Sequence, residues 1–396
     1  MTFTTRPEIQ GTFGMVTSTH WLASAVGMKL LESGGNAFDA AVATGFVLNV
    51  VEPQLNGPLG DMPALIWPAD DDAPTMICGQ GAAPAGATVA HYRSEGLDLI
   101  PGSGLLASVI PGAFDAWMVM LRDYGTMRLR DVLEPAIHYA EHGYPILKRT
   151  ADVIAGQATF FQEEWPTSAE VWLQEGAPPR PGQMFRNPAL AAFWSKLLSE
   201  AEGVEGRDAQ IEAARMAFYG GFVAEAIDSY LRDACVMDGA GERRKGVLTG
   251  ADMAGWKASK EPALSGQYMG WDVWKGGFWT QGPVLLQSLS MLEHTDVGAA
   301  GPVEADFVHL VVEAMKLAFA DREAYYGDPL TYDIAGDALL SAGYASDRAA
   351  LIQDEASTKL TPGDIRGQEA LAAAFLERAA RGAPVSAGAG GGEPTM

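Results

Sequence analysis

The sequence predicts a large domain of mixed α and β structure, in which helices pack on a mainly antiparallel sheet. Residues 15–78 combine short strand patterns with two apolar helices, residues 110–235 show the apolar spacing of helices, and residues 268–279 alternate aromatic and polar side chains. The order strand, helix pair, loop and hairpin in the first segment is typical of helices that cover an antiparallel sheet.

Composition narrows the class of protein. The 396 residues are 48% apolar and only 19% charged, with a formal net charge of −23, so the chain is not a disordered one. The acidic excess argues against nucleic-acid and anionic-membrane partners, which need clustered Lys and Arg. Cys78 and Cys235 have no CxxC partner, and we expect two reduced thiols. Residues 1–14 lack the apolar core of a signal peptide, and no run approaches the ~20 apolar residues of a membrane helix, so we expect a cytoplasmic protein.

Two helices are predicted near the start of the chain. Residues 20–31 place their apolar side chains on one helical face, and Gly34 follows where a left-handed C-terminal cap is needed. Asn36 is a favourable N-cap for a second helix over residues 37–50. That helix is rich in Ala and almost uncharged, so we expect it to be buried on nearly all sides.

Short strands are predicted at residues 15–18, 63–67 and 76–78, and a longer, half-buried strand is predicted at residues 268–279. The loop at residues 52–61 contains several Gly and Pro residues, which are typical of turns.

A mostly helical section covers about residues 110–235. The expected helices, with two later ones, are residues 115–124, 129–142, 189–200, 217–232, 306–326 and 371–380. The expected irregular segments are a Pro-rich loop at residues 163–188, an exposed turn at residues 239–250 and a flexible Gly-rich tail at residues 383–396.

The familiar catalytic motifs are missing from the chain. His138, Glu141 and His142 spell HxxEH, but without a third ligand they are better explained as exposed helix residues, and a metal-dependent hydrolase is the least favoured hypothesis. Asp321, followed by Arg322 and Glu323, is best explained as a structural salt-bridge cluster. We therefore expect no metal and no cofactor. Either the chain is a non-catalytic binding protein, or its catalytic group lies elsewhere.

Six blocks of sequence, in collinear order, carry a family resemblance. They are SGGNAFDAAVATGFVLNVVEP at 33–53, the helical block at 111–146, AFYGGFVAEAI at 217–227, the segment at 248–273, EAMKLAFADREAYYGDP at 313–329 and LLSAGYASDRAALI at 339–352. Together they resemble the gamma-glutamyltransferase family. The resemblance implies the four-layer αββα sandwich of N-terminal nucleophile hydrolases. Residues 1–382 would then form the large-subunit part of one domain, and a small subunit would complete it.

The resemblance also explains the missing catalytic group. Members of the family are precursors that cut themselves, and the new N-terminal Thr of the small subunit is the nucleophile, with its own α-amine as the base. We therefore expect no catalytic residue in this chain, a cleavage point directly after Met396, and a partner small subunit from the same precursor. A dimer of heterodimers agrees with the family.

Departures from the family pattern concern the substrate. Gln80 stands where the family has an Arg that binds the α-carboxylate of glutamate, and Gln supplies neither the charge nor the bidentate fork. Asn56 and Asp61 lie in an altered version of the family's Gly-rich loop. Trp279 and Gln281 lie in residues 277–283, which stand where the family has a Pro-rich loop with Ser and Gly. We expect these five residues to bind substrate.

These departures favour hydrolysis of a small amide other than glutathione, either oxamate-like or of the acylase type. Gamma-glutamyl hydrolysis or transfer, acting on glutathione or gamma-glutamyl amides, is the main alternative. A non-catalytic binding protein on the same fold is the alternative from another class.

Overall fold

The structure is a computed structural model that describes residues 8–331 and 333–381. The tail expected at residues 383–396 and the expected cleavage point at Met396 lie outside the described residues. Within the described ranges, none of the helices combines the length and the apolar character that crossing a bilayer requires.

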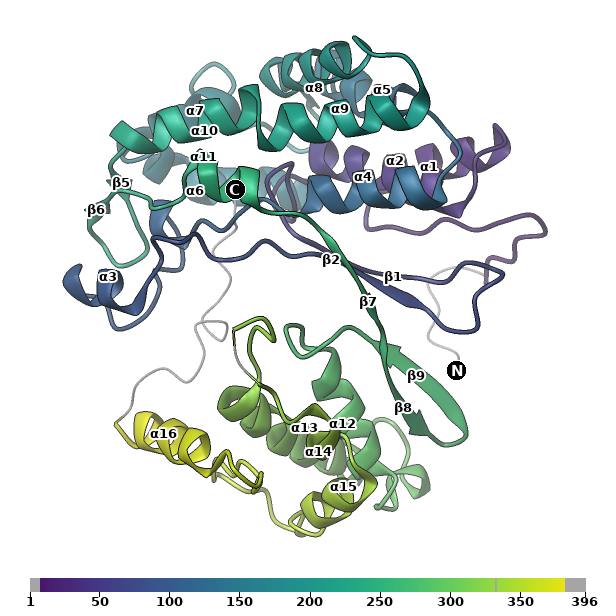
Figure 1. Ribbon diagram of the computed structural model, residues 1–396, viewed down its shortest axis with the longest axis vertical. Coiled ribbons are helices and arrows are strands. Elements are labelled where there is room, and N and C mark those ends of the chain that lie inside the picture. Colours follow the sequence, from purple (N-terminus) through teal and green to yellow (C-terminus); the bar gives the residue numbers. More distant parts are fainter. Residues whose placement is uncertain (1–7, 332, 382–396) are drawn as a thin grey trace. The chain divides into compact units, whose positions relative to one another are not determined.

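The chain divides into two compact units (Figure 1). Among the described residues, the first unit comprises residues 8–62 and 78–259, and the second comprises residues 63–77 and 260–381. The mostly helical section that the sequence predicts lies in the first unit. Whether residues 1–382 belong to one sandwich domain stays a prediction.

The first two helices form as expected. They are α1 (Trp21–Glu32) and α2 (Ala37–Val51). The His20 ring accepts the Leu22 N–H at the start of α1, and Gly34 follows α1 with φ of +94°. Asn36 and Asp39 form a capping box at the start of α2, most of whose residues are buried. The prediction of a buried second helix is therefore confirmed.

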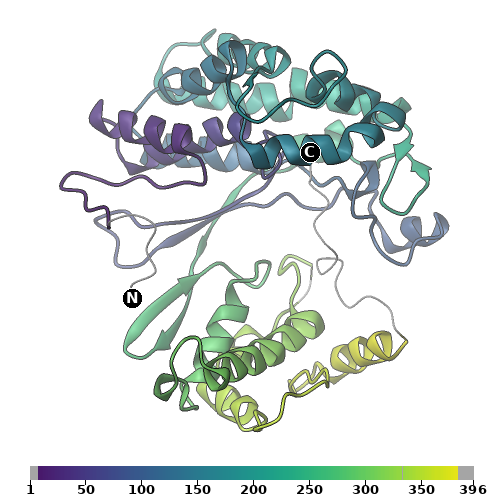
Figure 2. The same ribbon diagram turned by 180° about the vertical axis from the view of Figure 1, so that it is seen from behind.

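The first unit has further helices, most of which form two layers with the first pair, whereas the short helix at residues 89–94 lies apart from these layers (Figures 1 and 2). They are α3 (Val89–Ser94), α4 (Ala113–Tyr124), α5 (Leu129–His142), α6 (Lys148–Glu163), α7 (Pro166–Trp172), α8 (Pro188–Ala201), α9 (Arg207–Tyr219), α10 (Phe222–Asp233) and α11 (Gly250–Gly255), with a 3-10 turn at Leu105–Ala107. Contacts of α2 with α5 and of α4 with α9 join the layers.

Two predictions for this section are wrong. The single helix expected at residues 217–232 is broken by Gly220 and Gly221, which separate α9 from α10. Glycine favours such a break because it has a high conformational entropy to lose in a helix. The loop expected at residues 163–188 contains the short helix α7, whose first residue, Pro166, suits a helix N-terminus.

A three-stranded sheet has the order β1–β2–β7, from β1 (Met62–Ile66), β2 (Thr75–Gly79) and β7 (Ser259–Pro262). The boundaries between the two units fall within these strands. The strands predicted at residues 63–67 and 76–78 are confirmed as β1 and β2. The strand predicted at residues 15–18 is wrong, because within the described part of the chain these residues pair with no other strand.

Two small two-stranded sheets complete the first unit: β3 (Tyr144–Pro145) pairs with β4 (Met184–Phe185), and β5 (Val236–Met237) pairs with β6 (Arg243–Arg244). The prediction that residues 239–250 form an exposed turn is wrong at Arg244. This side chain is buried because it pairs with the buried Asp238 carboxylate, with 2.7 Å between Nη1 and Oδ2.

The second unit begins with a hairpin of β8 (Leu264–Tyr268) and β9 (Trp271–Lys275), in which Tyr268 pairs with Trp271. The continuous strand predicted at residues 268–279 is wrong. Met269 and Gly270 both have positive φ, of +49° and +82°, as a tight two-residue hairpin turn requires. Alternation alone cannot reveal such a turn, because the side chains on both sides of it keep a period of two.

The helices of the second unit are α12 (Gly282–Leu292), α13 (Ala305–Tyr325), α14 (Gly336–Leu339), α15 (Ala342–Ala349) and α16 (Glu369–Ala380), with a 3-10 turn at Val297–Ala299. The helices predicted at residues 306–326 and 371–380 are confirmed as α13 and α16. Ala314 and Ala318 of α13 are fully buried against Met291 of α12 in a small apolar core.

Candidate functional site

The five predicted binding residues are divided between the two units. Asn56, Asp61 and Gln80 belong to the first unit, and Trp279 and Gln281 belong to the second. Each group is therefore described within its own unit.

Asn56 serves the end of α2. Its Nδ2 donates to the backbone carbonyls of Leu48 and Glu52, at 3.3 Å and 3.2 Å, and its Oδ1 accepts from the Asn49 amide. Both carbonyls also accept backbone N–H groups, so the Asn56 amide adds a further hydrogen bond to each at the end of α2. The structure thus gives Asn56 a capping role, and a substrate contact by this residue stays a prediction.

Gln80 is exposed on a backbone that is tightly held on both sides. A Cβ on Gly81 would lie 1.4 Å from the carbonyl oxygen of Ile110, and one on Gly79 would lie 2.5 Å from the Cβ of Ala116. Only glycine permits backbones to approach this closely. The segment therefore presents the Gln80 side chain to solvent from a fixed base.

Asp61 is also exposed, and it follows a residue that binds the start of α4. The carbonyl of Gly60 accepts the N–H groups of Gly112 and Ala113, at 3.1 Å and 3.0 Å. The segments that carry Asp61 and Gln80 therefore both pack against residues 110–113. The structure brings these two predicted residues onto neighbouring segments, which their spacing in the sequence does not indicate.

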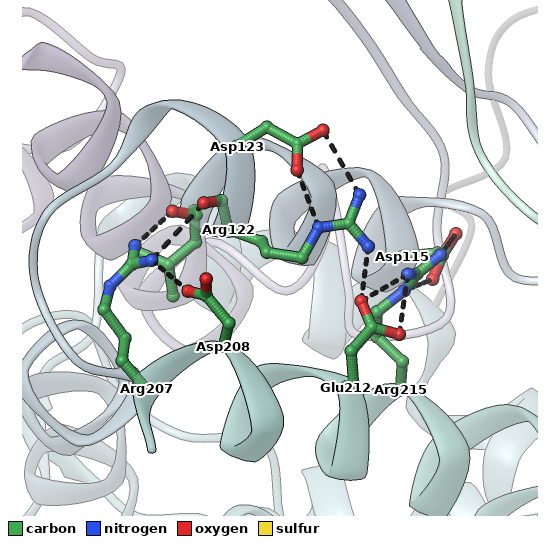
Figure 3. A network of polar contacts seen from close by, with 8 residues as sticks. Asp115, Arg122, Asp123, Arg207, Asp208, Glu212 and Arg215 are labelled. Carbon is green, nitrogen blue, oxygen red and sulfur yellow. Dashed lines mark hydrogen bonds and ion pairs between the residues drawn. The ribbon is translucent and has the colours of Figure 1, made fainter.

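An ion pair with a buried carboxylate holds the first turn of α4 against α9 (Figure 3). Arg215 of α9 binds the Asp115 carboxylate through two hydrogen bonds, of 2.5 Å and 3.0 Å. The bonds with Asp115 raise the pKa of Arg215. Asp115 also accepts the N–H of Ala258, just before β7, at 2.8 Å. The Tyr219 hydroxyl donates to the carbonyl of Pro111 at 2.6 Å, and burial raises the pKa of this phenol.

Further ion pairs extend this network along α4 and α9 (Figure 3). Glu212 binds both Arg215 and Arg122, and Arg122 also pairs with Asp123. Arg207 donates to the carbonyl of Met127 at 2.8 Å. No local pattern in the sequence indicates this network, because the Asp115 and Arg215 partners lie 100 positions apart.

A buried polar cluster lies beside the start of α1, and no local pattern in the sequence indicates it. The Thr19 hydroxyl donates to the Glu52 carboxylate, and both Glu52 and His20 are buried. His20 Nδ1 accepts a backbone N–H, so the neutral ring carries its proton on Nε2, which has no hydrogen-bond partner among the described residues. Burial lowers the pKa of His20, and the Glu52 charge partly opposes this effect.

In the second unit, Trp279 lines a pocket of about 270 Å³. Its indole Nε1 donates to Glu261 Oε2 at 2.8 Å, and Asp333 supplies a second carboxylate to the lining. Gln281 lies directly before α12, where its carbonyl accepts the N–H of Val284. Gln281 is exposed and is not among the residues that line the pocket. Of these two predicted residues, only Trp279 lines the pocket.

The HxxEH residues do not converge on a metal position. The rings of His138 and His142 stack with centroids 4.6 Å apart and planes inclined by 18°, and the His142 ring lies 3.8 Å from the Glu141 carboxylate. Stacked rings hold their nitrogens in nearly parallel planes, which does not bring them together on one ion. Among residues 8–331 and 333–381, no three His, Cys, Asp or Glu side chains form a group that could hold a metal.

Asp321 has a structural role, but with partners other than those expected. Its carboxylate accepts hydrogen bonds from Gln287, Tyr344, Arg348 and the backbone N–H of Gly363. The expected cluster with its two sequence neighbours is wrong, because Arg322 pairs with Glu323 instead. On a helix, adjacent side chains point in different directions, so Asp321 faces the interior while its neighbours do not.

Comparison with solved structures defines the class of protein. The gamma-glutamyltranspeptidase of Helicobacter pylori is 29% identical, with a TM-score of 0.79, and the match covers 90% of this chain and 97% of that one. A structure designated LmbA2991HD is 52% identical, with a TM-score of 0.86, over 92% of this chain and 62% of that one. The predicted α/β class and the fold of N-terminal nucleophile hydrolases are thus confirmed.

The family follows from the sequence match. Residues 23–380 match the family model for gamma-glutamyltranspeptidase, and the chain belongs to this family. The resemblance found in the six sequence blocks is therefore confirmed.

Three curated relatives are all named as proenzymes. They are acylase ACY 1 of Pseudomonas sp. (strain V22), 32% identical over 91% of this chain; the glutathione hydrolase-like YwrD of Bacillus subtilis, 31% over 86%; and oxamate amidohydrolase of Klebsiella pneumoniae, 31% over 88%. The matches cover 62%, 60% and 61% of these relatives, so the chain spans about three fifths of their length.

Proposed function

We propose that this chain is the large-subunit part of an amide hydrolase that binds its acyl group without a guanidinium at position 80. The exposed Gln80 side chain, held between two glycines beside the segment of Asp61, is the observation that carries the proposal. An Arg at this position would bind a carboxylate through two charge-assisted hydrogen bonds, each roughly twice as strong as a neutral one. Gln80 offers one neutral amide, which suits an acyl group that needs no charged contact at this position.

The exposed Asp61 carboxylate supports the same substrate class. A carboxylate on the neighbouring segment does not supply the positive charge that would bind the α-carboxylate of a gamma-glutamyl group in place of the missing guanidinium. The names of two relatives, an acylase and an oxamate amidohydrolase, agree with a small amide other than glutathione.

The nucleophile in this proposal is the N-terminal Thr of a small subunit released from the same precursor. The Thr hydroxyl attacks the amide carbonyl and passes its proton through the α-amine, whose pKa of roughly 8 suits a base at neutral pH. The amine product leaves with that proton, and water then hydrolyses the acyl-enzyme. The relatives are named as proenzymes, which supports a nucleophile on a second subunit that is released from the same precursor.

The proposal is tested with the processed enzyme on oxamate, glutaryl-p-nitroanilide and gamma-glutamyl-p-nitroanilide. We expect the gamma-glutamyl compound to be the poorest substrate, and Gln80→Arg to raise kcat/KM for it about tenfold, the equivalent of about 1.4 kcal/mol. Gln10→Arg adds the same charge at another exposed position of the first unit and should have no effect. A wild-type preference for the gamma-glutamyl compound would contradict the proposal.

Gamma-glutamyl hydrolysis or transfer is the second candidate, favoured by the similarity to the glutathione hydrolase-like relative. It predicts that glutathione is cleaved by the wild type and that an amine acceptor increases turnover. Intact-mass analysis of the purified protein, with N-terminal sequencing of any partner chain, tests the division into subunits that both candidates require. A binding protein without catalysis would yield no partner that begins with Thr.

A further inference from the structure

The segment at residues 13–18 pairs with no strand among the described residues, yet it keeps the pattern of a strand. Exposed and half-buried residues alternate without a break from Phe13 to Thr19. A period of two is produced by an extended chain that has different surroundings on its two sides. Val16 and Thr17 are also β-branched, which favours a strand.

The half-buried side of this segment lies along α1. Every second residue of the segment meets α1, about one helical turn nearer its start each time. The pairs are Gly14 with Leu31, Val16 with Gly27 and Ser18 with Ser24. A helical turn rises about 5.4 Å and two residues of a strand span roughly 6.4–6.8 Å, so this spacing requires a nearly extended chain. Helix α1 therefore holds the segment straight.

The contacts with α1 are close. The hydroxyl oxygens of Ser18 and Ser24 are 2.7 Å apart, and a Cβ on Gly27 would lie 2.8 Å from Val16 Cγ1. Glycine at position 27 thus lets the segment approach the helix. The conformation of the segment is fixed before any strand pairs with it, so little conformational entropy would be lost on pairing.

The opposite side of the segment and its backbone are open. Phe13 is 67% exposed and Met15 is 52% exposed. Among the described residues, the backbone N–H and carbonyl groups of residues 13–18 make no hydrogen bond. A straight apolar segment with a free row of such groups is a template for another strand. Its chemistry therefore specifies an extended backbone as the occupant, rather than a helix or a small molecule.

The comparison with relatives indicates where such a strand comes from. The chain spans about three fifths of three relatives that are named as proenzymes, so about two fifths of their length has no counterpart in it. A second copy of this chain is a poorer partner, because each copy brings a net charge of −23 and the two would repel each other.

We propose that residues 13–18 form a β-strand by pairing with a strand of the small subunit, which also covers Phe13 and Met15. Backbone hydrogen bonds supply the affinity in this mode of recognition. Thr19 follows directly, and its hydroxyl donates to Glu52, just before the loop that carries Asp61. The strand thus connects the subunit that carries the nucleophile with a segment of the substrate site. The inference rests on the proposed function, which supplies the second chain.

Amide hydrogen exchange of the purified, processed enzyme tests the pairing. We expect the amides of residues 14–18 to exchange at least about a hundredfold more slowly than those of the exposed residues 204–206. Equal exchange of the two segments in a two-chain enzyme would overturn this inference and leave the proposed function standing. A purified protein without a second chain would contradict the proposed function as well.

Proline substitutions test whether the backbone itself makes the contact. Thr17→Pro removes an N–H group, whereas Thr17→Ala removes only an exposed side chain, so the two variants are a matched pair. Val16→Pro and Val16→Ala repeat the comparison for an N–H group that points the opposite way along the strand. At one of these positions or both, we expect Pro to accelerate exchange of the remaining amides at least about tenfold relative to Ala. No difference at either position would contradict the proposal, because an unpaired extended segment tolerates Pro.

Photocrosslinking identifies the partner. Met15 is replaced by p-benzoylphenylalanine in the full precursor, and Met216, an exposed residue of α9, is replaced in the control. We expect the Met15 product alone to have the summed mass of the large and small subunits. A product with twice the mass of the large subunit, or a crosslink within the large subunit, would overturn the proposal. Unfolding midpoints identify any Pro variant that fails to fold, and the crosslink keeps every backbone N–H, so it decides in that case.

Discussion

Arg215 of α9 holds the buried Asp115 carboxylate of α4 through two hydrogen bonds, of 2.5 Å and 3.0 Å (Figure 3). Asp115 lies in the first turn of α4, only three residues after Gly112, which binds the loop that carries Asp61. The ion pair therefore helps to hold residues 110–113, against which the segments of Asp61 and Gln80 pack.

Breaking this pair should be costly. Arg215→Met leaves the Asp115 charge buried without its guanidinium, and we expect a loss of about 3–5 kcal/mol in the free energy of unfolding. Arg130→Met removes a much more exposed pair with Glu202 and should cost no more than about 1 kcal/mol. Urea denaturation of both variants measures the difference, and equal losses would show that Asp115 has no special role.

The glycine beside Gln80 should tolerate no side chain. Gly81→Ala places a methyl group 1.4 Å from the Ile110 carbonyl oxygen, so we expect a loss of stability of about 3 kcal/mol or more, with loss of activity. Gly57→Ala, in the loop before Asp61, meets no atom within 4 Å and should change stability little. Thermal unfolding compares the two, and a stable Gly81→Ala variant would contradict the close backbone contact.

The buried His20 predicts a loss of stability on mild acidification. Its pKa is lowered by burial from the ordinary value of 6.5, so the folded state binds fewer protons than the unfolded state as the pH falls through this value. Stability is thus fully present above pH 6.5 and decreases below it. His20→Asn keeps an acceptor for the Leu22 N–H but cannot titrate, and it should flatten the dependence. Urea midpoints between about pH 5 and 7.5 test this, and parallel curves would exclude His20 as the cause.

The Asp321 network predicts a ranking of three variants. Asp321→Asn leaves the buried Arg348 without its counter-charge and should cost about 3–5 kcal/mol. Tyr344→Phe removes one 2.9 Å hydrogen bond to the carboxylate and should cost about 1.5–3 kcal/mol. Arg322→Met removes a pair with Glu323 and should cost about 1 kcal/mol or less. Guanidinium denaturation gives the order, and a larger effect of Arg322→Met than of Asp321→Asn would reverse it.

Local patterns were sufficient for much of the secondary structure. The Asn36 cap, Gly34 and the apolar content of α2 lie within a short stretch of chain, and the interactions that form the helix span only a few residues. The pattern failed where backbone conformation changed without changing the alternation, as at Met269 and Gly270, or where a glycine pair divided one apolar face into two helices.

The site was predicted less completely than the helices. The sequence identified Gln80, Asp61 and Trp279 as departures from the family pattern, and their role in substrate binding stays a prediction. It also assigned a binding role to Asn56, whose amide caps α2 in the structure. A polar residue after a helix has the same sequence signature whether it binds a ligand, the helix end or both, and the structure describes only the bonds to the helix end.

The sequence by itself determined the family, the fold class and the helices that short-range periodicity and capping encode. Only the tertiary structure decided that the Asp61 and Gln80 segments meet on residues 110–113, that Arg215 binds Asp115, and that Trp279 shares a pocket with two carboxylates. The physical reason is the range of the interactions. Helix hydrogen bonds join residues four apart, whereas these contacts depend on how distant segments pack, and their energies depend on the burial that this packing creates.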